Sequence, residues 1–358
     1  MAIEARIHKL ANIVVGYSLK VKRGENVVIS GSTEASDFII ALHQAIIKKG
    51  AHPILRLTLP GLSSFFFKYA QRHQLENYPK IFDYTVKNSQ KYIGVDTEFN
   101  TKELSGIHPK KITLREKITQ KITNYIVNRR DKIWRCTVGF PCVSLAQEAE
   151  MSASDFEDFV FSACLQNWKK LGQKIDKILK KFRKGKEVHL IGQGIDLKFE
   201  IRGDKAQADK GEENMPGGEI YMAPFKKTVE GFVKFDFPAV FTGQEVDGIY
   251  LEFKNGKVIK ATATKNETLL KAMIATDKNA SYLGEFGIGC NPKIKRFTKN
   301  LLFDEKIGGT IHLALGMAYK DNGGGNDSAI HWDMVKNMSK AKIILDGKIV
   351  QQNGKFKI

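Results

Sequence analysis

The sequence predicts an α/β protein whose N-terminal domain, with a mostly parallel sheet, precedes an α+β domain rich in antiparallel strands. Three observations predict this fold class. Strand-like and helix-like segments alternate in the first half, consecutive strand-like segments follow from about residue 187, and 358 residues exceed the length of most single cores. We therefore expect an N-terminal α/β domain over residues 1–188 and a second domain over residues 189–358.

Short apolar runs and helical patterns alternate in the N-terminal domain. The run NVVISG is followed by the helical spacing of ASDFIIALHQAIIKKG and then by the aliphatic run HPILRLTL. Such a β-α-β unit implies parallel strands, since its helix carries the chain back to the start of the next strand. The expected elements are strands over residues 27–32, 52–59, 91–96 and 133–140 and helices over residues 35–50 and 109–129.

Two local features mark the passage to the second domain. An S-x-x-E pattern formed by Ser154 and Glu157 predicts a capping box for a helix that leads toward a lysine-rich segment. After it, hairpin turns are expected at Asn255-Gly256 and Asp346-Gly347, because each dipeptide lies between apolar runs. The second domain should therefore be built mainly from antiparallel strands.

Composition narrows the class of protein. With 42% hydrophobic and 27% charged residues, the chain has enough apolar content to fold into a globular core. No apolar run reaches the length of a membrane span, and the N-terminal 24 residues resemble an amphipathic helix and not a signal peptide. We expect a cytoplasmic protein without a membrane partner. Its cysteines form no C-x-x-C pair and are expected to be reduced thiols: Cys136, Cys142, Cys164 and Cys290.

The net charge of +18 raises the alternative of a nucleic-acid partner. The densest lysine run, residues 167–186, places its apolar residues at helical spacing and its lysines on the opposite face. A solvated helix face explains this pattern more simply than a polyanion-binding helix does. No reader motif and no interleaving of basic and aromatic residues is found, so no nucleic-acid partner is expected.

Five ionisable residues of the second domain stand in unusual surroundings. His312 lies within an apolar run typical of a buried strand, and His331 and Asp333 are two residues apart, which places them on one face of an extended segment. Glu285 lies among glycines and apolar residues, and Glu219 follows a Pro-Gly-Gly turn. A buried carboxylate is costly unless it is paired or bound to a cation, which makes these five residues candidate metal ligands.

The ligand types indicate which ions such a site would bind. Carboxylates and imidazoles without thiolates suit zinc, cobalt or manganese, and a majority of carboxylates suits a two-metal hydrolytic centre. Spacing alone leaves an alternative open, since each histidine taken singly fits a core residue bonded to the backbone.

The order of four motifs carries a resemblance to a known family. The motifs are KGEENMPGGEIYMAP, YLGEFGIGCNP, LLFDEKIGGTIHLALGMAY and GGGNDSAIHWDMV. In this order they resemble the aminopeptidase T and aminopeptidase S family of thermophilic-type metalloaminopeptidases, also labelled leucyl aminopeptidases. The resemblance extends over the whole chain, because VKRGENVVISG and GAHPILRLTLP are similar to the first domain of that family, though less distinctively.

The resemblance implies a role for each candidate residue. Two divalent metal ions (zinc, cobalt or manganese) would be bound by five residues of a metal-binding catalytic domain over residues 189–358: Glu219, Glu285, His312, His331 and Asp333. Glu285 would bridge the ions. Tyr319 would hydrogen-bond the developing oxyanion, and Glu305 would act as general base or support the ligands. The segment between Glu305 and His312 is two residues longer than in some members, which puts the role of Glu305 in question.

The implied function is release of N-terminal amino acids from peptides by attack of a metal-bridged hydroxide on the scissile carbonyl. Its substrates would be peptides with a free N-terminus, and a homodimer would enclose the active sites. Two alternatives remain: a different dinuclear metal hydrolase such as a phosphoesterase, and a basic nucleic-acid-binding protein without catalysis. The first is disfavoured because Arg296 is the only arginine near the motifs that could hold phosphate.

Overall fold

The computed structural model describes residues 4–241 and 243–357 of the chain. By compactness the chain divides into a first unit, residues 1–166 with 211–216, and a second unit, residues 167–210 with 217–358. The α/β fold class expected from the sequence is confirmed, with a parallel sheet in the first unit and antiparallel sheets in the second. The domain boundary between residues 188 and 189 stays a prediction.

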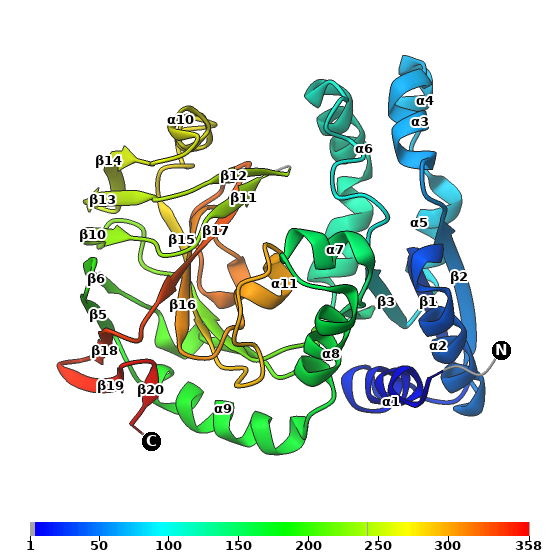
Figure 1. Ribbon diagram of the computed structural model, residues 1–358, viewed down its shortest axis with the longest axis horizontal. Coiled ribbons are helices and arrows are strands. Elements are labelled where there is room, and N and C mark those ends of the chain that lie inside the picture. The colour runs from blue at the N-terminus through cyan, green and yellow to red at the C-terminus, as the bar shows by residue number, and fades with distance from the viewer. Residues whose placement is uncertain (1–3, 242, 358) are drawn as a thin grey trace. The chain divides into compact units, whose positions relative to one another are not determined.

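A parallel sheet forms the centre of the first unit (Figure 1). Within the described ranges its strand order is β2-β1-β3-β4-β8, and each neighbouring pair is parallel. The order follows from β-α-β connections, which bring successive parallel strands side by side. All four strands predicted for this region are confirmed. The strands are β1 (Asn26–Ser32), β2 (His52–Thr58), β3 (Lys91–Asp96), β4 (Trp134–Gly139) and β8 (Asn214–Met215).

Helices cover the strands of this sheet, and the two longest were expected from the sequence. Helix α2 (Ser36–Lys48) connects β1 to β2, and α6 (Pro109–Asn128) connects β3 to β4 with its proline in the first turn. Phe38 of α2 stacks on Phe140 with ring centroids 4.9 Å apart. The other α-helices described in this unit are α1 (Ala5–Ile13), α3 (Leu62–Tyr69), α4 (Arg72–Leu75), α5 (Lys80–Lys87), α7 (Val143–Glu148) and α8 (Ala153–Cys164).

Two predictions for the ends of helices have different outcomes. The expected amphipathic helix near the N-terminus is α1, although residues 1–3 lie outside the described residues. The capping box of Ser154 and Glu157 is wrong. Ser152 is the extended residue before α8, and its hydroxyl accepts a hydrogen bond from the Asp155 backbone N–H at 3.1 Å. Ser154 already lies inside the first turn, and Glu157 instead binds Arg6 at 2.7 Å.

Antiparallel strands dominate the second unit. In the described part of the chain an eight-stranded sheet has the order β14-β13-β10-β6-β5-β18-β19-β20, and a five-stranded sheet has the order β17-β16-β15-β9-β7. The eight-stranded sheet consists of β5 (Glu187–Gly192), β6 (Ile195–Glu200), β10 (Glu230–Lys234), β13 (Tyr250–Lys254), β14 (Lys257–Thr262), β18 (Ala341–Leu345), β19 (Lys348–Gln352) and β20 (Lys355–Phe356).

The five-stranded sheet carries the residues that the sequence singled out. It consists of β7 (Gln207–Asp209), β9 (Glu219–Met222), β15 (Leu283–Gly289), β16 (Thr310–Gly316) and β17 (His331–Asn337). Every residue of β15 and β16 is buried, so both faces of these strands are covered. The other elements are β11 (Ala239–Phe241), β12 (Gln244–Val246), α9 (Trp168–Phe182), α10 (Glu267–Ile274) and α11 (Leu301–Asp304).

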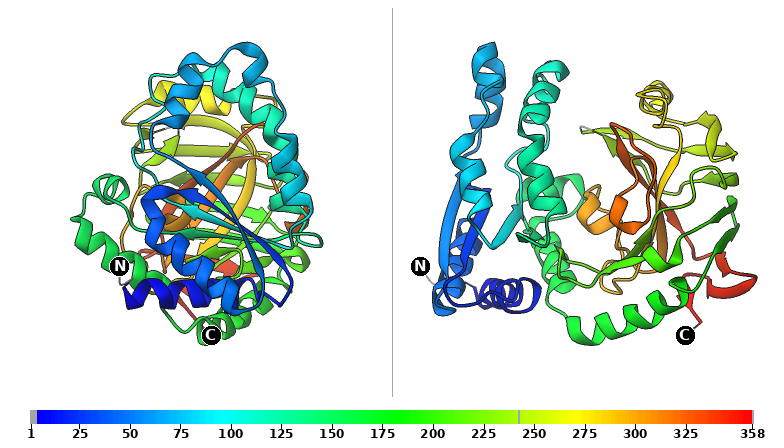
Figure 2. Two further views of the ribbon diagram at one scale, coloured as in Figure 1. Left: turned by 90° about the vertical axis from the view of Figure 1, so that its right-hand side faces the viewer. Right: turned by 180° about the vertical axis from the view of Figure 1, so that it is seen from behind.

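Aromatic side chains join the two large sheets of the second unit. The rings of Phe199 on β6 and Phe286 on β15 lie 5.2 Å apart, and Phe182 of α9 lies 6.3 Å from Phe286. Helix α9 runs along one end of these sheets (Figures 1 and 2) and buries the apolar face predicted for it, while its lysines remain on the other face. The lysine-rich segment is therefore an ordinary amphipathic helix.

Both predicted hairpin turns are confirmed. Asn255 and Gly256 have φ values of 50° and 79°, and Asp346 and Gly347 have φ values of 48° and 76°. Positive φ at both central residues is the geometry of the tight turn that fits the twist of paired strands. No helix within the described ranges combines the length and apolar character needed to cross a membrane.

Candidate metal centre

Strand pairing brings the predicted ligands onto one face of the five-stranded sheet. Asp333 pairs with Ala314 across β17 and β16, and Ala314 pairs with Glu285 across β16 and β15. His312 precedes Ala314 by two residues, and His331 precedes Asp333 by two residues. Because side chains alternate along a strand, both imidazoles share the face of the carboxylates. The extended His-x-Asp segment expected from the sequence is thus observed.

Glycines leave space for this group between the strands. Glu219 on β9 pairs with Gly289 on β15, and His312 pairs with Gly287 on the same strand. A Cβ atom on Gly287 would overlap the His312 ring, which lies directly across it. The glycines around Glu285 therefore have a structural role: they leave room for the His312 imidazole to extend over the neighbouring strand β15.

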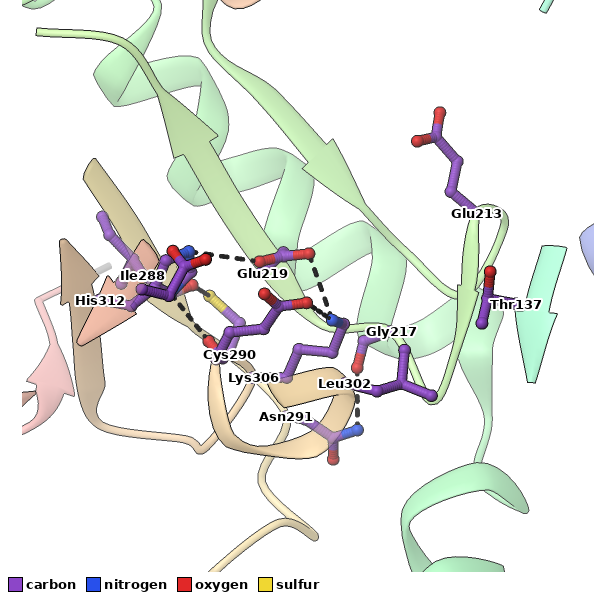
Figure 3. Close-up of polar contacts among 12 residues, drawn as sticks. Thr137, Glu213, Gly217, Glu219, Ile288, Cys290, Asn291, Leu302, Lys306 and His312 are labelled. Atoms are coloured by element: carbon purple, nitrogen blue, oxygen red, sulfur yellow. Dashed lines mark hydrogen bonds and ion pairs between the residues drawn. The ribbon is translucent and has the colours of Figure 1, made fainter. Parts of the chain in front are cut away.

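The polar atoms of the cluster approach one another closely. His312 Nε2 lies 3.6 Å from Glu219 Oε2 and 3.4 Å from Glu285 Oε1, and His331 Nε2 lies 3.4 Å from Asp333 Oδ2. Figure 3 shows Glu219 between His312 and Lys306. The side chain of His312 is fully buried, and the carboxylates of the three acidic residues are nearly so.

Backbone carbonyls set the tautomer of both imidazoles. His312 Nδ1 donates to the Glu305 carbonyl at 3.1 Å, and His331 Nδ1 donates to the Met317 carbonyl at 2.8 Å. A carbonyl only accepts, so Nδ1 carries the hydrogen and the neutral ring presents a bare Nε2 to the carboxylates. This arrangement is typical of histidines that bind metals.

Two atoms of the cluster lack the partners that buried polar atoms normally have. His312 Nε2 and Asp333 Oδ1 are buried, and neither has a hydrogen-bond partner among the residues described. Such an orphan costs about 1–3 kcal/mol. Both atoms are of types that coordinate divalent cations, so a cation bound here would satisfy them, and the residues present fit that group.

The charges in the cluster perturb its proton affinities. Burial lowers the pKa of His312, but the contact with the Glu285 carboxylate and the Glu219 charge outweigh it and raise the pKa to about 9. Burial also lowers the pKa of His331, but the negative charge of Asp333 outweighs it and raises the pKa to about 10. Burial raises the pKa of Glu219, and the neighbouring Glu305 adds to that rise. Without a cation, protons stabilise these negative charges.

The ligand atoms form two overlapping groups that share His312. One group joins Glu219, Glu305 and His312, and the other joins Glu285, His312 and Asp333; within each group the atoms lie within 4.8 Å of one another. The carboxylate of Glu305 therefore lies at the cluster, although the sequence left its role in question. The side chain of His331 lies beside the second group, through its contact with Asp333.

Two residues at the cluster were missed by sequence reasoning. Lys306 is fully buried and forms ion pairs with Glu219, at 3.4 Å, and with Glu305. Asn322 donates from Nδ2 to Glu285 Oε2 at 3.3 Å. A lysine directly after Glu305 in a segment of small and apolar residues was the available signal for the first, and no sequence pattern marked the second.

Two other residues bear on the chemistry of the site. The Tyr319 ring lies 5.0 Å from the His331 ring and is 37% exposed, so the expected oxyanion partner lies at the solvent side of the cluster. Cys290 donates its thiol to the Ile288 carbonyl at 3.4 Å, and burial raises its pKa, so it remains a protonated thiol. All four cysteines are free of disulfide bonds.

The mixed α/β fold and the buried cluster of carboxylates and imidazoles define the class of protein. It is a protein suited to bind divalent cations in its antiparallel half. Comparison with known proteins identifies the family within that class. The model of the thermophilic metalloprotease family (M29) matches residues 3–356. The chain belongs to this family and is a metal-dependent hydrolase of peptide bonds.

Individual relatives agree with this assignment. The chain is 26% identical to aminopeptidase AmpS of Bacillus subtilis, over 96% of this chain and 89% of that protein. It is also 26% identical to aminopeptidase T of Thermus thermophilus, over 93% of this chain and 92% of that protein. The solved structure of wild-type AmpT from Thermus thermophilus superposes with a TM-score of 0.86 at 23% identity, and the match covers 100% of both chains. This last likeness establishes the fold.

Proposed function

We propose that this metalloprotease is an aminopeptidase that releases N-terminal amino acids from peptides, with its chemistry at the cluster on the five-stranded sheet. The observation that carries the proposal is the pair of imidazoles, His312 and His331, held by backbone carbonyls in the tautomer that aims Nε2 at carboxylates. The names of the relatives, aminopeptidases of bacteria, support the same activity.

The cluster would hold two divalent cations, zinc, cobalt or manganese. Its proposed ligands are Glu219, Glu285, His312, His331 and Asp333, and we assign Glu285 the bridging role that the family resemblance implies. Bound cations of this kind polarise a carbonyl and lower the pKa of a water molecule so that it becomes a nucleophile at neutral pH. Asn322 holds one oxygen of Glu285 and so fixes the orientation of that carboxylate.

Two further side chains would assist the reaction. Glu305 is 17% exposed at its side chain, compared with 7% for Glu219 and 8% for Glu285, so it is the cluster carboxylate best able to exchange a proton with an entering water molecule. We assign it the role of general base, which then delivers the proton to the leaving amine. Tyr319 would donate its hydroxyl proton to the oxyanion that develops on the scissile carbonyl.

Assembly and location complete the proposal. A homodimer that encloses the active sites would restrict access to chain ends, and peptides with a free N-terminus would be the partners. A cytoplasmic location agrees with the lack of a membrane-spanning helix in the described residues.

The proposal is tested by removing and restoring metal. The protein is stripped with a chelator and then assayed on amino-acid p-nitroanilides with zinc, cobalt, manganese or no metal. We expect activity to disappear on stripping and to return with at least one ion. The same p-nitroanilides with an acetylated α-amine should not be cleaved. Their cleavage would show that a free N-terminus is not required, and failure of every ion to support activity would contradict the assignment.

A further inference from the structure

Lys306 is a cation built into the candidate metal centre. Its side chain is fully buried, and its ammonium forms ion pairs with Glu219 and Glu305. The backbone fixes the residue on both sides, because its N–H donates to the Phe303 carbonyl and its own carbonyl accepts from Asn291, both at 3.0 Å. The ammonium is thus held at its place by the fold, with no freedom to leave for solvent.

This ammonium belongs to one half of the cluster. Glu219 and Glu305, with which it forms ion pairs, are two of the three residues in one group, whereas the Glu285, His312 and Asp333 group forms no ion pair with a lysine or arginine in the described residues. In that second group, Asp333 Oδ1 is buried without a hydrogen-bond partner. The Lys306 charge also reaches Asp333, whose pKa it helps to lower, but the ammonium contacts only the first group. The two halves therefore offer a cation different electrostatic surroundings.

We propose that Lys306 is a positioning residue that makes the two metal subsites unequal. The subsite at Glu285, His312 and Asp333 binds its ion tightly. The subsite at Glu219 and His312, beside the general base Glu305, binds its ion weakly, because that ion must share the Glu219 carboxylate with a fixed ammonium. The inference rests on the proposed function for the presence of the ions, and concerns their order and affinity.

Electrostatics gives the reason for the difference. Like charges a few ångströms apart in a buried site repel strongly, and the repulsion is not screened by water. An entering divalent ion would have to displace the ammonium from the carboxylate oxygens of Glu219 and Glu305. These two carboxylates would repel each other in the absence of a cation. Lys306 holds them together before any metal ion binds. Lys306 therefore preserves the geometry of the weaker subsite and lowers its affinity for a metal ion.

Equilibrium binding of manganese to the stripped protein, followed by calorimetry and by metal content after dialysis, tests the proposal. We expect two ions per chain whose dissociation constants differ by about 100-fold or more. Asp333→Asn should weaken the tight ion, and Glu219→Gln should weaken only the weak ion. Two ions of equal affinity, or the reverse assignment of the two variants, would overturn the proposal.

Replacement of the lysine provides the second arm. Lys306→Met should strengthen the weak ion by about tenfold or more and leave the tight ion little changed. The matched control is Lys336→Met, which removes another buried lysine, on the opposite face of β17, paired with Asp236 at 2.9 Å. It should change neither constant. Unchanged binding in Lys306→Met would refute the role of Lys306.

The experiment separates the two hypotheses. Far-UV circular dichroism establishes whether Lys306→Met folds, and if it does not, the wild-type titration with Asp333→Asn and Glu219→Gln decides alone. If the wild-type protein binds no divalent ion, the proposed function fails with the inference. If it binds two ions with equal affinity and cleaves p-nitroanilides, only the inference fails.

Discussion

The two large sheets of the second unit treat charged side chains in opposite ways. The eight-stranded sheet keeps its ion pairs at the surface, as with Lys198 and Glu187, which lie 3.0 Å apart and are 53% and 45% exposed. The five-stranded sheet buries Glu285, His312 and Asp333 between covered faces. The eight-stranded sheet leaves such charges in water, and the five-stranded sheet gathers several buried ionisable groups on one face.

The difference indicates that the buried charges of the five-stranded sheet do not serve stability. A desolvated charge costs several kcal/mol even in a protein that relaxes around it, and an orphaned ligand atom adds to that cost. Apolar residues such as Phe286 and Trp332 pack the other face of the five-stranded sheet, so its core does not depend on these groups alone. A bound cation is the compensation that would make the arrangement favourable.

The largest expected effect on activity comes from replacing a histidine of the five-stranded sheet, compared with a histidine of the eight-stranded sheet. His312→Ala should lower kcat/KM on an amino-acid p-nitroanilide by about 1,000-fold or more, because it removes an atom shared by both ligand groups. His189→Ala on the eight-stranded sheet, where the imidazole meets Asp196 at 2.8 Å near the surface, should leave activity near wild type. Equal losses in both variants would break the comparison.

The next effect tests the space that the cluster needs. Gly287→Ala places a methyl group against the His312 ring and should lower activity by about 10- to 100-fold, since a displaced ligand costs affinity for metal. Steady-state kinetics at saturating metal, with metal content measured in parallel, checks this. Gly16→Ala is the control, since a Cβ there meets nothing within 4 Å. Full activity and full metal content in Gly287→Ala would show that His312 can reach its position without the glycine.

A partly buried ion-pair cluster at the small sheet formed by β11 and β12 lies between the exposed pairs and the buried metal centre. Glu245 contacts Lys265 at 2.8 Å and Lys299 at 2.9 Å, and these hydrogen bonds lower its pKa from 4.5 to about 2. A lowered pKa in the folded state stabilises the protein above pH 4.5, and the contribution is lost as the pH falls toward 2. Glu245→Gln should therefore cost about 1–3 kcal/mol at pH 7.

Urea unfolding of Glu245→Gln and the wild-type protein at several pH values measures this contribution. The difference in unfolding free energy should shrink as the pH is lowered, because the wild-type carboxylate then becomes protonated. A difference that stays constant down to pH 3 would contradict the assigned cause.

The smallest effect belongs to the exposed pair of the eight-stranded sheet. Lys198→Met should change the free energy of unfolding by no more than about 0.5 kcal/mol, because water and salt screen an ion pair at the surface. Urea unfolding at low and high salt is the measurement. A loss above about 2 kcal/mol would place this pair among the buried interactions and remove the contrast between the sheets.

Periodicity in the sequence was enough to predict most of the fold. The apolar strands and helices of the first unit, the Asn255-Gly256 turn and the amphipathic residues of α9 all follow from local patterns, which is why they were found. The capping residue of α8 was misplaced because two serines lie two residues apart and only the backbone conformation selects Ser152. Helix ends are decided by such local competition.

The site was less accessible to sequence reasoning. Unusual surroundings marked Glu285 and His312, since a charge among apolar and glycine residues requires an explanation. The order of the strands, which brings Glu219 beside His312 over more than 90 intervening residues, is a property of the tertiary fold. Lys306 was missed for the same reason, because a lysine is normally at the surface and only packing shows that this one is buried.

Anomalous diffraction from crystals grown with manganese or zinc tests the central claim most directly. Data collected at the absorption edge of the added ion would show whether the cluster on the five-stranded sheet holds it. We expect anomalous density next to His312 Nε2, in contact with Glu285 and Asp333. Its absence there, or its presence only at surface carboxylates, would contradict the assignment of this cluster as the metal centre.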